Sequence, residues 1–386
     1  MTPRENLLAV LRHETPDYLP YTPLIGPYNV PASLPKALLK EKGNRFWKAD
    51  IIRFLGGDIM DRSGGAVASV QRGDVETTSK KEGDYTVHVT KTPVGSVTSR
   101  RKSVVVDSSY AETPSQEDIV PVGPIHLSRI VERSIKTVSD YKVIQYIYEN
   151  TEHQLQDNGI RQYIDYIGDG GVAMAIGSGT PIMRLILDYA GIERVVYDLQ
   201  DHPKQVESLL EVMNQRFLEW YQAAASSYAQ VIMCSDDADT RLISPKMFER
   251  YEATVLKKCA EICHRQGKVL IVHMCGHVRG FLHLIRDTDI DALDCLCPPS
   301  TGNTTMKMAR DVWEDKITII ARIDPPVLVH GNPEEVSAIV REMLRQVIPG
   351  DNFILVVPCG RAPLENIQAA KDIVRQFGKY PVERVP

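Results

Sequence analysis

The 386-residue sequence contains no long apolar run and no set of cysteines that could form a disulfide framework. A helix needs about 20 apolar residues to cross a bilayer, and no segment approaches that length. The seven cysteines are an odd number and lie scattered along the chain, which indicates reduced thiols. The N-terminal segment also lacks the apolar core of a signal peptide. These absences predict a cytoplasmic protein without a membrane segment.

An excess of basic charge is also missing, since the formal net charge is −5 and the pI is about 6.1. The short basic run at 100–102 lies in a strand-like stretch, where a solvated strand end explains it. We therefore expect no nucleic-acid partner. No G-x-G-x-x-G follows any predicted strand, which argues against an open dinucleotide-binding sheet.

From residue 172 onward, short apolar segments alternate with amphipathic helical stretches, and Ser, Thr or Asn followed by Pro marks several helix starts. Six βα units in a row predict a parallel sheet. Residues 19–23 and 56–61 can supply two more strands, so we predict an α/β fold of the (β/α)8 TIM-barrel type. The six strand segments are 172–178, 230–236, 268–276, 290–297, 317–324 and 353–359.

Residues 64–110 show a different pattern, with apolar and polar residues alternating at period two between Gly-containing turns. This pattern predicts two or three antiparallel strands inserted between barrel elements. We expect residues 1–386 to form one TIM-barrel domain that contains this β-rich insertion. If the insertion covers one end of the barrel, it could act as a substrate lid. An insertion without a functional role explains the pattern equally well.

Side chains that can bind a metal lie at the carboxyl ends of the predicted strands, where barrel enzymes have their active sites. His273 and Cys275 are two residues apart on one strand, so they face the same side. Imidazole and thiolate together suit Zn²⁺, and three protein ligands with one open position are typical of a catalytic site. A free cysteine is often only a small buried side chain. Cys359, at the end of the last strand, is the best candidate for a third ligand.

Two carboxylates follow the second of the six strands. Asp236 and Asp237 could supply a fourth ligand, a general base or a group that orients His273. Helix capping or pairing with Arg241 explains them equally well. We therefore treat both aspartates as candidate catalytic residues.

Three further residues lie close to the same strand ends. His277 comes directly after the Cys-Gly pair and could touch the substrate, although an exposed histidine without a role is an equal alternative. Cys295 and Cys297 are two apart on the next strand and could face the site. As core thiols they need no function, so they rank below Cys359.

Four segments resemble a known superfamily: RENLLAVLRHETPDYLP, DDADTRLISPKMFERY, IVHMCGH and VVPCGRAPLENIQAAKDIV. They are similar to the uroporphyrinogen decarboxylase superfamily, and within it to the zinc-dependent, corrinoid-linked methyltransferases. The family pattern His-x-Cys with a distal Cys falls on His273, Cys275 and Cys359. The resemblance thus implies a TIM barrel whose zinc ion is held by these three residues.

The resemblance also implies an activity and a partner. Such an enzyme moves a methyl group between a small methylated compound (methoxy, amine or thiol) and cobalamin, with Zn²⁺ acting on the substrate that is not the corrinoid. No corrinoid-binding Asp-x-His-x-x-Gly motif occurs here, so the cobalamin must arrive on a separate corrinoid protein. The direction of transfer is open, the β-rich insertion favours demethylation, and a homodimer is a further expectation.

A decarboxylase is the alternative. The true decarboxylases carry a Met-Arg-Gln-Ala-Gly-Arg stretch after the first strand, and its arginines meet substrate carboxylates. This sequence has no arginine between Arg12 and Arg45, so it lacks that clamp. A metal-independent decarboxylase or lyase that uses Asp236 or Asp237 electrostatically stays open, as does a binding protein with a vestigial site.

Overall fold

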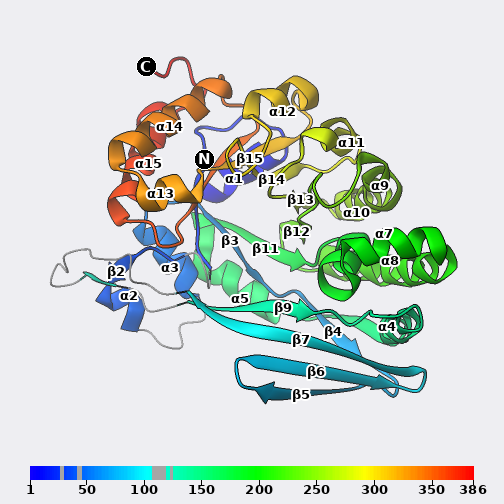
Figure 1. The fold of residues 1–386 in the computed structure, drawn as a ribbon. Coiled ribbons are helices and arrows are strands. Elements are labelled where there is room, and N and C mark those ends of the chain that lie inside the picture. Colours follow the sequence, from blue (N-terminus) through cyan, green and yellow to red (C-terminus); the bar gives the residue numbers. More distant parts are fainter. Residues whose placement is uncertain (27–29, 41–45, 107–118, 122–124) are drawn as a thin grey trace.

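Eight parallel strands form the central sheet of the computed structural model, which describes residues 1–26, 30–40, 46–106, 119–121 and 125–386. Their order is β1-β16-β15-β14-β13-β12-β11-β3. The two end strands also meet, since the N–H of Asp58, just before β3, donates to Tyr21 O of β1 at 2.9 Å. The sheet is a nearly closed (β/α)8 TIM barrel, so the predicted fold class is confirmed (Figure 1). The barrel strands are β1 (Tyr21–Leu24), β3 (Ile59–Gly64), β11 (Gly171–Gly177), β12 (Val231–Ser235), β13 (Val269–His273), β14 (Ala292–Leu296), β15 (Thr318–Arg322) and β16 (Phe353–Pro358).

Both faces of these strands are buried. On β16, Ile354 and Val356 belong to the cluster inside the barrel, whereas Phe353, Leu355 and Val357 belong to the cluster under the helices. A strand buried on both faces reads as a continuous apolar run, which is why the sequence alone reveals it. The helices are α1 (Pro3–Leu11), α2 (Lys36–Lys40), α3 (Trp47–Phe54), α4 (Asp140–Glu149), α5 (Asn158–Ile167), α6 (Pro181–Arg184), α7 (Ile192–Asp201), α8 (Pro203–Ala225), α9 (Pro245–Met247), α10 (Thr254–Arg265), α11 (Leu282–Arg286), α12 (Met306–Trp313), α13 (Pro325–His330), α14 (Pro333–Gln346) and α15 (Leu364–Phe377). There are also 3₁₀ turns at Gly168–Gly170 and Arg279–Phe281 and π-helical turns at Leu185–Ala190 and Phe248–Ala253.

Helix α1 (Pro3–Leu11) closes the amino-terminal end of the barrel. It begins with a capping box and a proline in its first turn, both of which stabilise a helix start. Its Leu7, Val10 and Leu11 belong to the cluster inside the barrel. The hydroxyl of Thr318, at the start of β15, donates to Val10 O at 2.8 Å. The plugged end is therefore the one where the strands begin, and the strand-end side chains lie at the opposite end.

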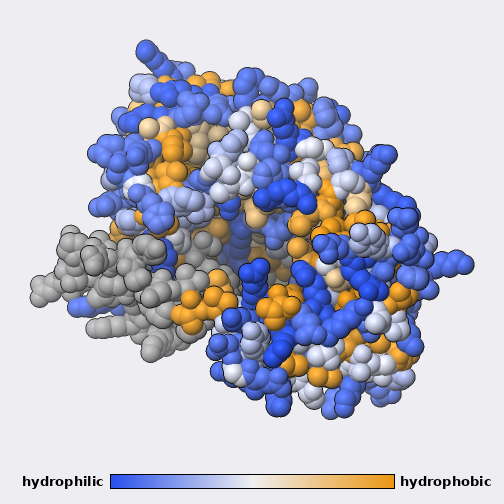
Figure 2. Space-filling view, in the orientation of Figure 1, coloured by the Kyte–Doolittle hydropathy of each residue, from blue (hydrophilic) through white to orange (hydrophobic). Residues whose placement is uncertain are grey.

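A long β-rich insertion separates β3 from β11. Four of its strands form an antiparallel sheet in the order β5-β6-β7-β9, and β4 pairs with β10. Its β8 pairs with β2, which precedes β3 in the chain. The four-stranded sheet lies outside the ring of helices, beside α4 (Figure 1). In the same orientation the surface is hollowed over the barrel strands (Figure 2). These strands are β2 (Ser33–Pro35), β4 (Val67–Gln71), β5 (Glu76–Glu82), β6 (Tyr85–Thr92), β7 (Gly95–Val106), β8 (Ile119–Pro121), β9 (Ile125–Glu132) and β10 (Thr151–Leu155).

The predicted insertion 64–110 contains more strand than expected. Four strands, β4 to β7, lie within it, and the strands β9 and β10 that complete their sheets follow it in the chain. Residues 107–110 of the predicted range lie outside the described residues. The assignment of 1–386 to one domain stays a prediction.

A helix that spans a membrane must be both long and apolar. The 23-residue α8 pairs a buried face with a polar one. In the part of the chain that the structure describes, no helix is both long enough and apolar enough to traverse a bilayer.

Barrel closure depends on a glycine at the start of β11. A Cβ on Gly171 would lie 1.9 Å from Ile59 O on β3, and because that atom belongs to the backbone, a side chain would force the two strands apart. We expect Gly171→Ala to destabilise the protein by roughly 1–3 kcal/mol or more, measured as a lower Tm. Gly65→Ala is the matched control, since no atom lies within 4 Å of the Cβ it would add. Equal Tm values for the two variants would contradict this account of closure.

Candidate metal centre

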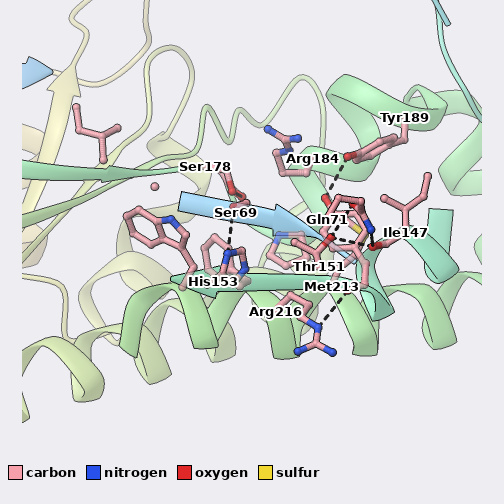
Figure 3. Close-up of a pocket in the computed structure, with 17 residues that line it drawn as sticks. Ser69, Gln71, Ile147, Thr151, His153, Ser178, Arg184, Tyr189, Met213 and Arg216 are labelled. Carbon is pink, nitrogen blue, oxygen red and sulfur yellow. Dashed lines mark hydrogen bonds between the residues drawn. The ribbon is translucent and has the colours of Figure 1, made fainter. Parts of the chain in front are cut away.

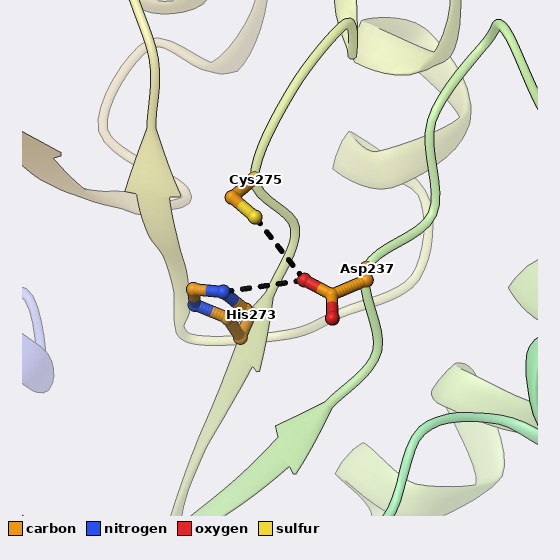
Figure 4. A group of neighbouring side chains, drawn as sticks. All are labelled: Asp237, His273 and Cys275. Atoms are coloured by element: carbon orange, nitrogen blue, oxygen red, sulfur yellow. Dashed lines mark hydrogen bonds and ion pairs between the residues drawn. The ribbon is translucent and has the colours of Figure 1, made fainter. Parts of the chain in front are cut away.

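Three potential ligands meet at the carboxyl ends of β12 and β13 (Figure 4). His273 ends β13, Cys275 follows two residues later, and Asp237 lies just beyond β12. Asp237 Oδ1 lies 3.3 Å from His273 Nε2 and accepts a hydrogen bond from Cys275 Sγ at 3.2 Å. The three ligand atoms lie within 4.8 Å of one another. An imidazole, a thiol and a carboxylate in this arrangement are a donor set that Zn²⁺ accepts.

The other ring nitrogen of His273 is held by a second carboxylate. Asp294 Oδ2, on β14, lies 2.6 Å from His273 Nδ1 and 2.5 Å from Arg62 Nη2. These contacts orient the ring so that Nε2 faces Asp237 and Cys275. A carboxylate on the far nitrogen is the usual support of a metal-binding histidine. The geometry therefore fits a metal ligand better than an isolated core histidine.

The charges in this group stabilise one another. Burial alone would raise the pKa of Asp294, but the charges of Arg62 and His273 outweigh it and lower that pKa. Burial also opposes the ionisation of Asp237, yet its hydrogen bond with His273 brings the pKa below the ordinary value. Burial disfavours the His273 cation, but Asp294 and Asp237 raise its pKa well above the ordinary value. The two carboxylates thus favour the protonated imidazole, whereas a metal ligand must be the neutral form.

Two backbone positions shape the loops that carry these side chains. Asp237 has φ of 73°, a left-handed conformation that non-glycine residues rarely adopt and that is concentrated at functional sites. Gly276 has φ of 132°, and a Cβ there would lie 2.2 Å from Asp239 Oδ2. The glycine after Cys275 is therefore required by both conformation and space.

Cys359 lies apart from this group. It follows β16, is fully buried, and its thiol donates to Val357 O at 3.2 Å. It belongs with Val357 to the apolar cluster between the barrel and the helices. Burial raises the pKa of its thiol. Its role as the third ligand stays a prediction, and Asp237 occupies the third place beside His273 and Cys275.

The other predicted site residues take different positions. Asp236 is buried behind the end of β12, where it accepts the N–H of Thr180 at 2.6 Å. His277 is partly buried, and its Nδ1 lies 3.7 Å from Asp239 Oδ2. Cys295 forms a second group with His273 and Asp294, within 4.8 Å. Asp237 is thus the one of the two neighbouring aspartates that joins the cluster, and the catalytic roles of Asp236 and His277 stay predictions.

Arg62 belongs to this centre and is absent from the site residues that the sequence predicts. A signal was present, because it directly follows the predicted strand 56–61 and lies two residues after Met60, which packs inside the barrel. Alternate residues of a strand face the same side. The end of β3 therefore carries a residue of the centre, as do the ends of the later strands.

A cavity of about 430 Å³ lies beside the barrel, between helices α6 and α8 and the β4–β10 pair (Figure 3). Its lining includes Ser178, at the end of β11, and His153 and Arg184. The next residue after Ser178 packs against the β12 loop, since a Cβ on Gly179 would lie 2.8 Å from Ser235 O. The cavity therefore borders the loop that carries Asp237, and the insertion supplies one of its walls.

The protein is thus a nearly closed (β/α)8 barrel that carries an imidazole–thiol–carboxylate group at the carboxyl ends of its strands. The family model for uroporphyrinogen decarboxylase (URO-D) matches residues 129–377. This match covers well over half of the sequence. The chain therefore belongs to the uroporphyrinogen decarboxylase family.

Two solved structures were compared with this chain, and the first of them shows the same fold. A methyltransferase from Methanosarcina mazei matches with a TM-score of 0.57 and 16% identity, over 98% of this chain and 99% of that chain. D-psicose 3-epimerase from Clostridium cellulolyticum H10 matches with a TM-score of 0.37 and 11% identity, over 57% of this chain and 84% of that chain. A search of curated proteins finds no match to the sequence.

A buried carboxyl group lies behind the centre. Glu252, in a π-helical turn before α10, is fully buried, as is its neighbour Asp236. Burial raises the pKa of Glu252 well above its ordinary value, and the charge of Asp236 raises it further. A protonated Glu252 can donate a hydrogen bond to the Asp236 carboxylate. This pair supports the start of the loop that continues to Asp237.

The raised pKa predicts a pH dependence. Glu252 stabilises the fold most fully below its unfolded pKa of about 4.3. This stability is lost as the pH rises toward the folded pKa, by at most about 1.4 kcal/mol per pH unit. Glu252→Gln removes the ionisation, so we expect its Tm to rise relative to wild type between pH 5 and pH 7. Glu249→Gln is the control, because Glu249 lies exposed in the same turn. A Tm difference between wild type and Glu252→Gln that does not change with pH would rule out a raised pKa.

Proposed function

We propose that this protein is a zinc-dependent methyltransferase that moves a methyl group between a small methylated compound and the cobalamin of a partner corrinoid protein. The observation that carries the proposal is the group of Asp237, His273 and Cys275, with Asp294 on the far nitrogen of the imidazole. The likeness to a protein named as a methyltransferase supports it. The absence of a corrinoid motif in the sequence supports a separate corrinoid carrier, and we retain the homodimer as the expected assembly.

The metal ligands in this proposal are His273, Cys275 and Cys359. To join the others, the Cys359 thiol must leave its hydrogen bond to Val357 O. Asp237 is the competing third ligand, since it already contacts the other two residues. When bound, Zn²⁺ supplies Lewis-acid chemistry at the heteroatom of the substrate and favours the deprotonated form of a thiol.

The protein's own residues do the remaining work. Asp294 and Arg62 hold the imidazole of His273 in one orientation, and Asp294 favours the tautomer that leaves Nε2 facing the site. Asp237 is half exposed at 50% of its side-chain surface, so it can take a proton from a substrate thiol and pass it to solvent. Asp236 holds the start of the same loop through Thr180, and His277 is the candidate for contact with substrate at the rim.

The site is open toward the strand ends, which suits docking of a second protein that carries the corrinoid. The β4–β10 pair of the insertion lines the cavity that borders the Asp237 loop. The insertion therefore lies close enough to the centre to contact a substrate larger than a simple thiol. This position supports the preference for demethylation of a small methylated compound over methylation of a bare thiol.

Zinc content tests the centre. We expect about one zinc per chain in wild type, and loss of most of it in His273→Ala and Cys275→Ser, because each removes a direct ligand. Asp294→Asn should weaken zinc binding by about 10- to 100-fold, as loss of an outer-shell partner does. The measurements are metal analysis and zinc competition with a chelator. Cys263→Ser is the matched control, since Cys263 is a buried thiol on α10 outside the cluster.

The third ligand is decided by comparing two variants. We expect Cys359→Ser to lose more zinc affinity than Asp237→Asn, and X-ray absorption of the wild-type protein to show two sulfur ligands. One sulfur ligand, together with the larger loss in Asp237→Asn, would assign the third position to Asp237. Less than about 0.2 zinc per chain in gently purified wild type would contradict the metal centre altogether.

Methyl transfer is followed through the absorption of cobalamin. Zinc-loaded protein should demethylate methylcobalamin in the presence of a thiol, or methylate cob(I)alamin in the presence of a methoxy compound. His273→Ala should abolish either reaction. A zinc-bound protein that catalyses neither reaction with a panel of such compounds would favour a binding protein. Release of CO₂ from a carboxylic acid by metal-free protein would favour the decarboxylase.

A further inference from the structure

The cavity beside the barrel has one wall made by helix α8. Met213, Phe217 and Trp220 line it, and their spacing places them on one face of the helix. Met213 and Phe217 belong to the cluster between the barrel and the helices. The metal centre, by contrast, lies at the ends of the strands. The cavity is therefore a hollow of its own, lateral to the metal centre.

Two tyrosines add further aromatic surface to the lining. Tyr148, on α4, and Tyr189 both line the cavity, and their ring centroids lie 6.1 Å apart at an interplanar angle of 73°. Their hydroxyls are 3.2 Å apart. Together with Phe217 and Trp220 they surround about 430 Å³, which lies in the usual range of small-molecule sites, roughly 300–1,000 Å³. Aromatic side chains pack favourably against another aromatic ring, face to face with an offset or edge to face.

Hydroxyl groups supply the polar part of the lining. Ser69 on β4 lies opposite His153 on β10, with Ser69 Oγ at 3.1 Å from His153 Nδ1. Ser178, at the end of β11, is exposed, and its hydroxyl donates to Gly179 O at 3.2 Å. A hydroxyl has one donor and two acceptor lone pairs. Ser178 Oγ therefore still has the capacity to accept a hydrogen bond from an O–H or N–H group in the cavity.

The charges in the lining are already compensated. Among the described residues that line the cavity, the charged ones are Arg184 and Arg216. Arg184 pairs with Asp188 at 2.9 Å, and Arg216 pairs with Glu219 at 2.6 Å. Burial lowers the pKa of His153, so its imidazole is neutral at neutral pH. A charged ligand would lose hydration here without gaining a free opposite charge, and the lining therefore suits an uncharged ligand.

We propose that this cavity binds an uncharged molecule that carries an aromatic ring and a hydrogen-bond donor. The ring packs among the side chains of Tyr148, Tyr189, Phe217 and Trp220, and the donor reaches Ser178. The inference goes beyond the proposed function, because neither a metal nor methyl transfer enters it. Since the β4–β10 pair supplies one wall, the insertion completes a binding site that the barrel alone does not have.

The contact between Ser69 and His153 does not by itself indicate a site. Ser79 on β5 and His88 on β6 are also paired across two antiparallel strands, with Ser79 Oγ at 2.8 Å from His88 Nδ1. Ser69 differs because it lines the cavity. The likeness of the two pairs makes Ser79 a matched control for Ser69.

The first test measures binding of three compounds to the full-length protein, as purified, by calorimetry. The compounds are 2-naphthol, its saturated analogue decahydro-2-naphthol, and 6-hydroxy-2-naphthoate, which adds a charge to the same ring. We expect saturable binding of 2-naphthol, about tenfold or more tighter than binding of either analogue, because one analogue lacks the aromatic ring and the other brings an uncompensated charge. No saturable binding of 2-naphthol, or equal affinity for all three compounds, overturns the proposal.

Variants of the lining test which side chains hold the ligand. Trp220→Leu removes one ring and should weaken 2-naphthol about fivefold while the affinity for decahydro-2-naphthol changes less than about twofold. Ser69→Phe fills part of the cavity from an exposed strand position, so it should weaken both compounds, whereas Ser79→Phe should weaken neither. Thermal unfolding shows that each variant is folded, and if Ser69→Phe is not, Trp220→Leu alone decides. Unchanged binding in the folded variants overturns the proposal.

The location of the ligand is tested by photolabelling. The uncharged 4-hydroxybenzophenone, irradiated with the protein and followed by mass spectrometry, should label the segments 147–153 and 213–220, which line the cavity. Excess 2-naphthol should suppress this labelling, with zinc present or removed. Suppressible labelling of segments 236–237 or 273–275 instead places the ring at the metal centre and overturns the proposal. Absence of zinc or of methyl transfer contradicts the proposed function and leaves this inference standing.

Discussion

The carboxylate of Asp294 is the interaction on which the centre depends. It is 1% exposed and lies between the guanidinium of Arg62 and the imidazole of His273. A buried carboxylate without partners would be strongly destabilising, and removing either partner leaves an uncompensated charge. The three residues come from β3, β14 and β13, so one ionic contact ties the first half of the barrel to the second. It also sets the imidazole orientation that any metal at this site requires.

Side-chain alternation explains why this polar layer can exist inside an apolar barrel. Below it, Met60, Ile271 and Ala292 pack inside the barrel together with the side chains of α1. Each of these strands continues by two residues, and the next inward positions are Arg62, His273 and Asp294. The apolar layers stabilise the barrel, and the last inward layer carries the polar side chains. This division is typical of barrels whose sites lie at the carboxyl ends of the strands.

Loops add what the strands cannot supply. Asp237 reaches the centre from beyond the end of β12 in a left-handed conformation, and Gly276 allows the loop after Cys275 to pass Asp239. The Asp237 conformation carries a local cost that the surrounding contacts must offset, whereas glycine adopts a positive φ without this cost. The buried pair of Asp236 and Glu252 anchors the same loop from behind. The Asp237 loop is therefore held both by its contacts at the centre and by the buried pair behind it.

The sequence by itself determined the barrel, because strands buried on two faces read as apolar runs. It also singled out His273 and Cys275 as two residues of one strand, but β13 ends at His273, so the loop after the strand sets the position of Cys275. Only the tertiary structure decided which distant groups join the pair. Arg62 lies 211 residues before His273, and no local pattern links them. Asp237 and Cys359 both follow strand ends, where the alternation of the strand no longer sets the direction of a side chain. Their placement depends on loop conformation and barrel closure, which arise only when the whole sheet has formed.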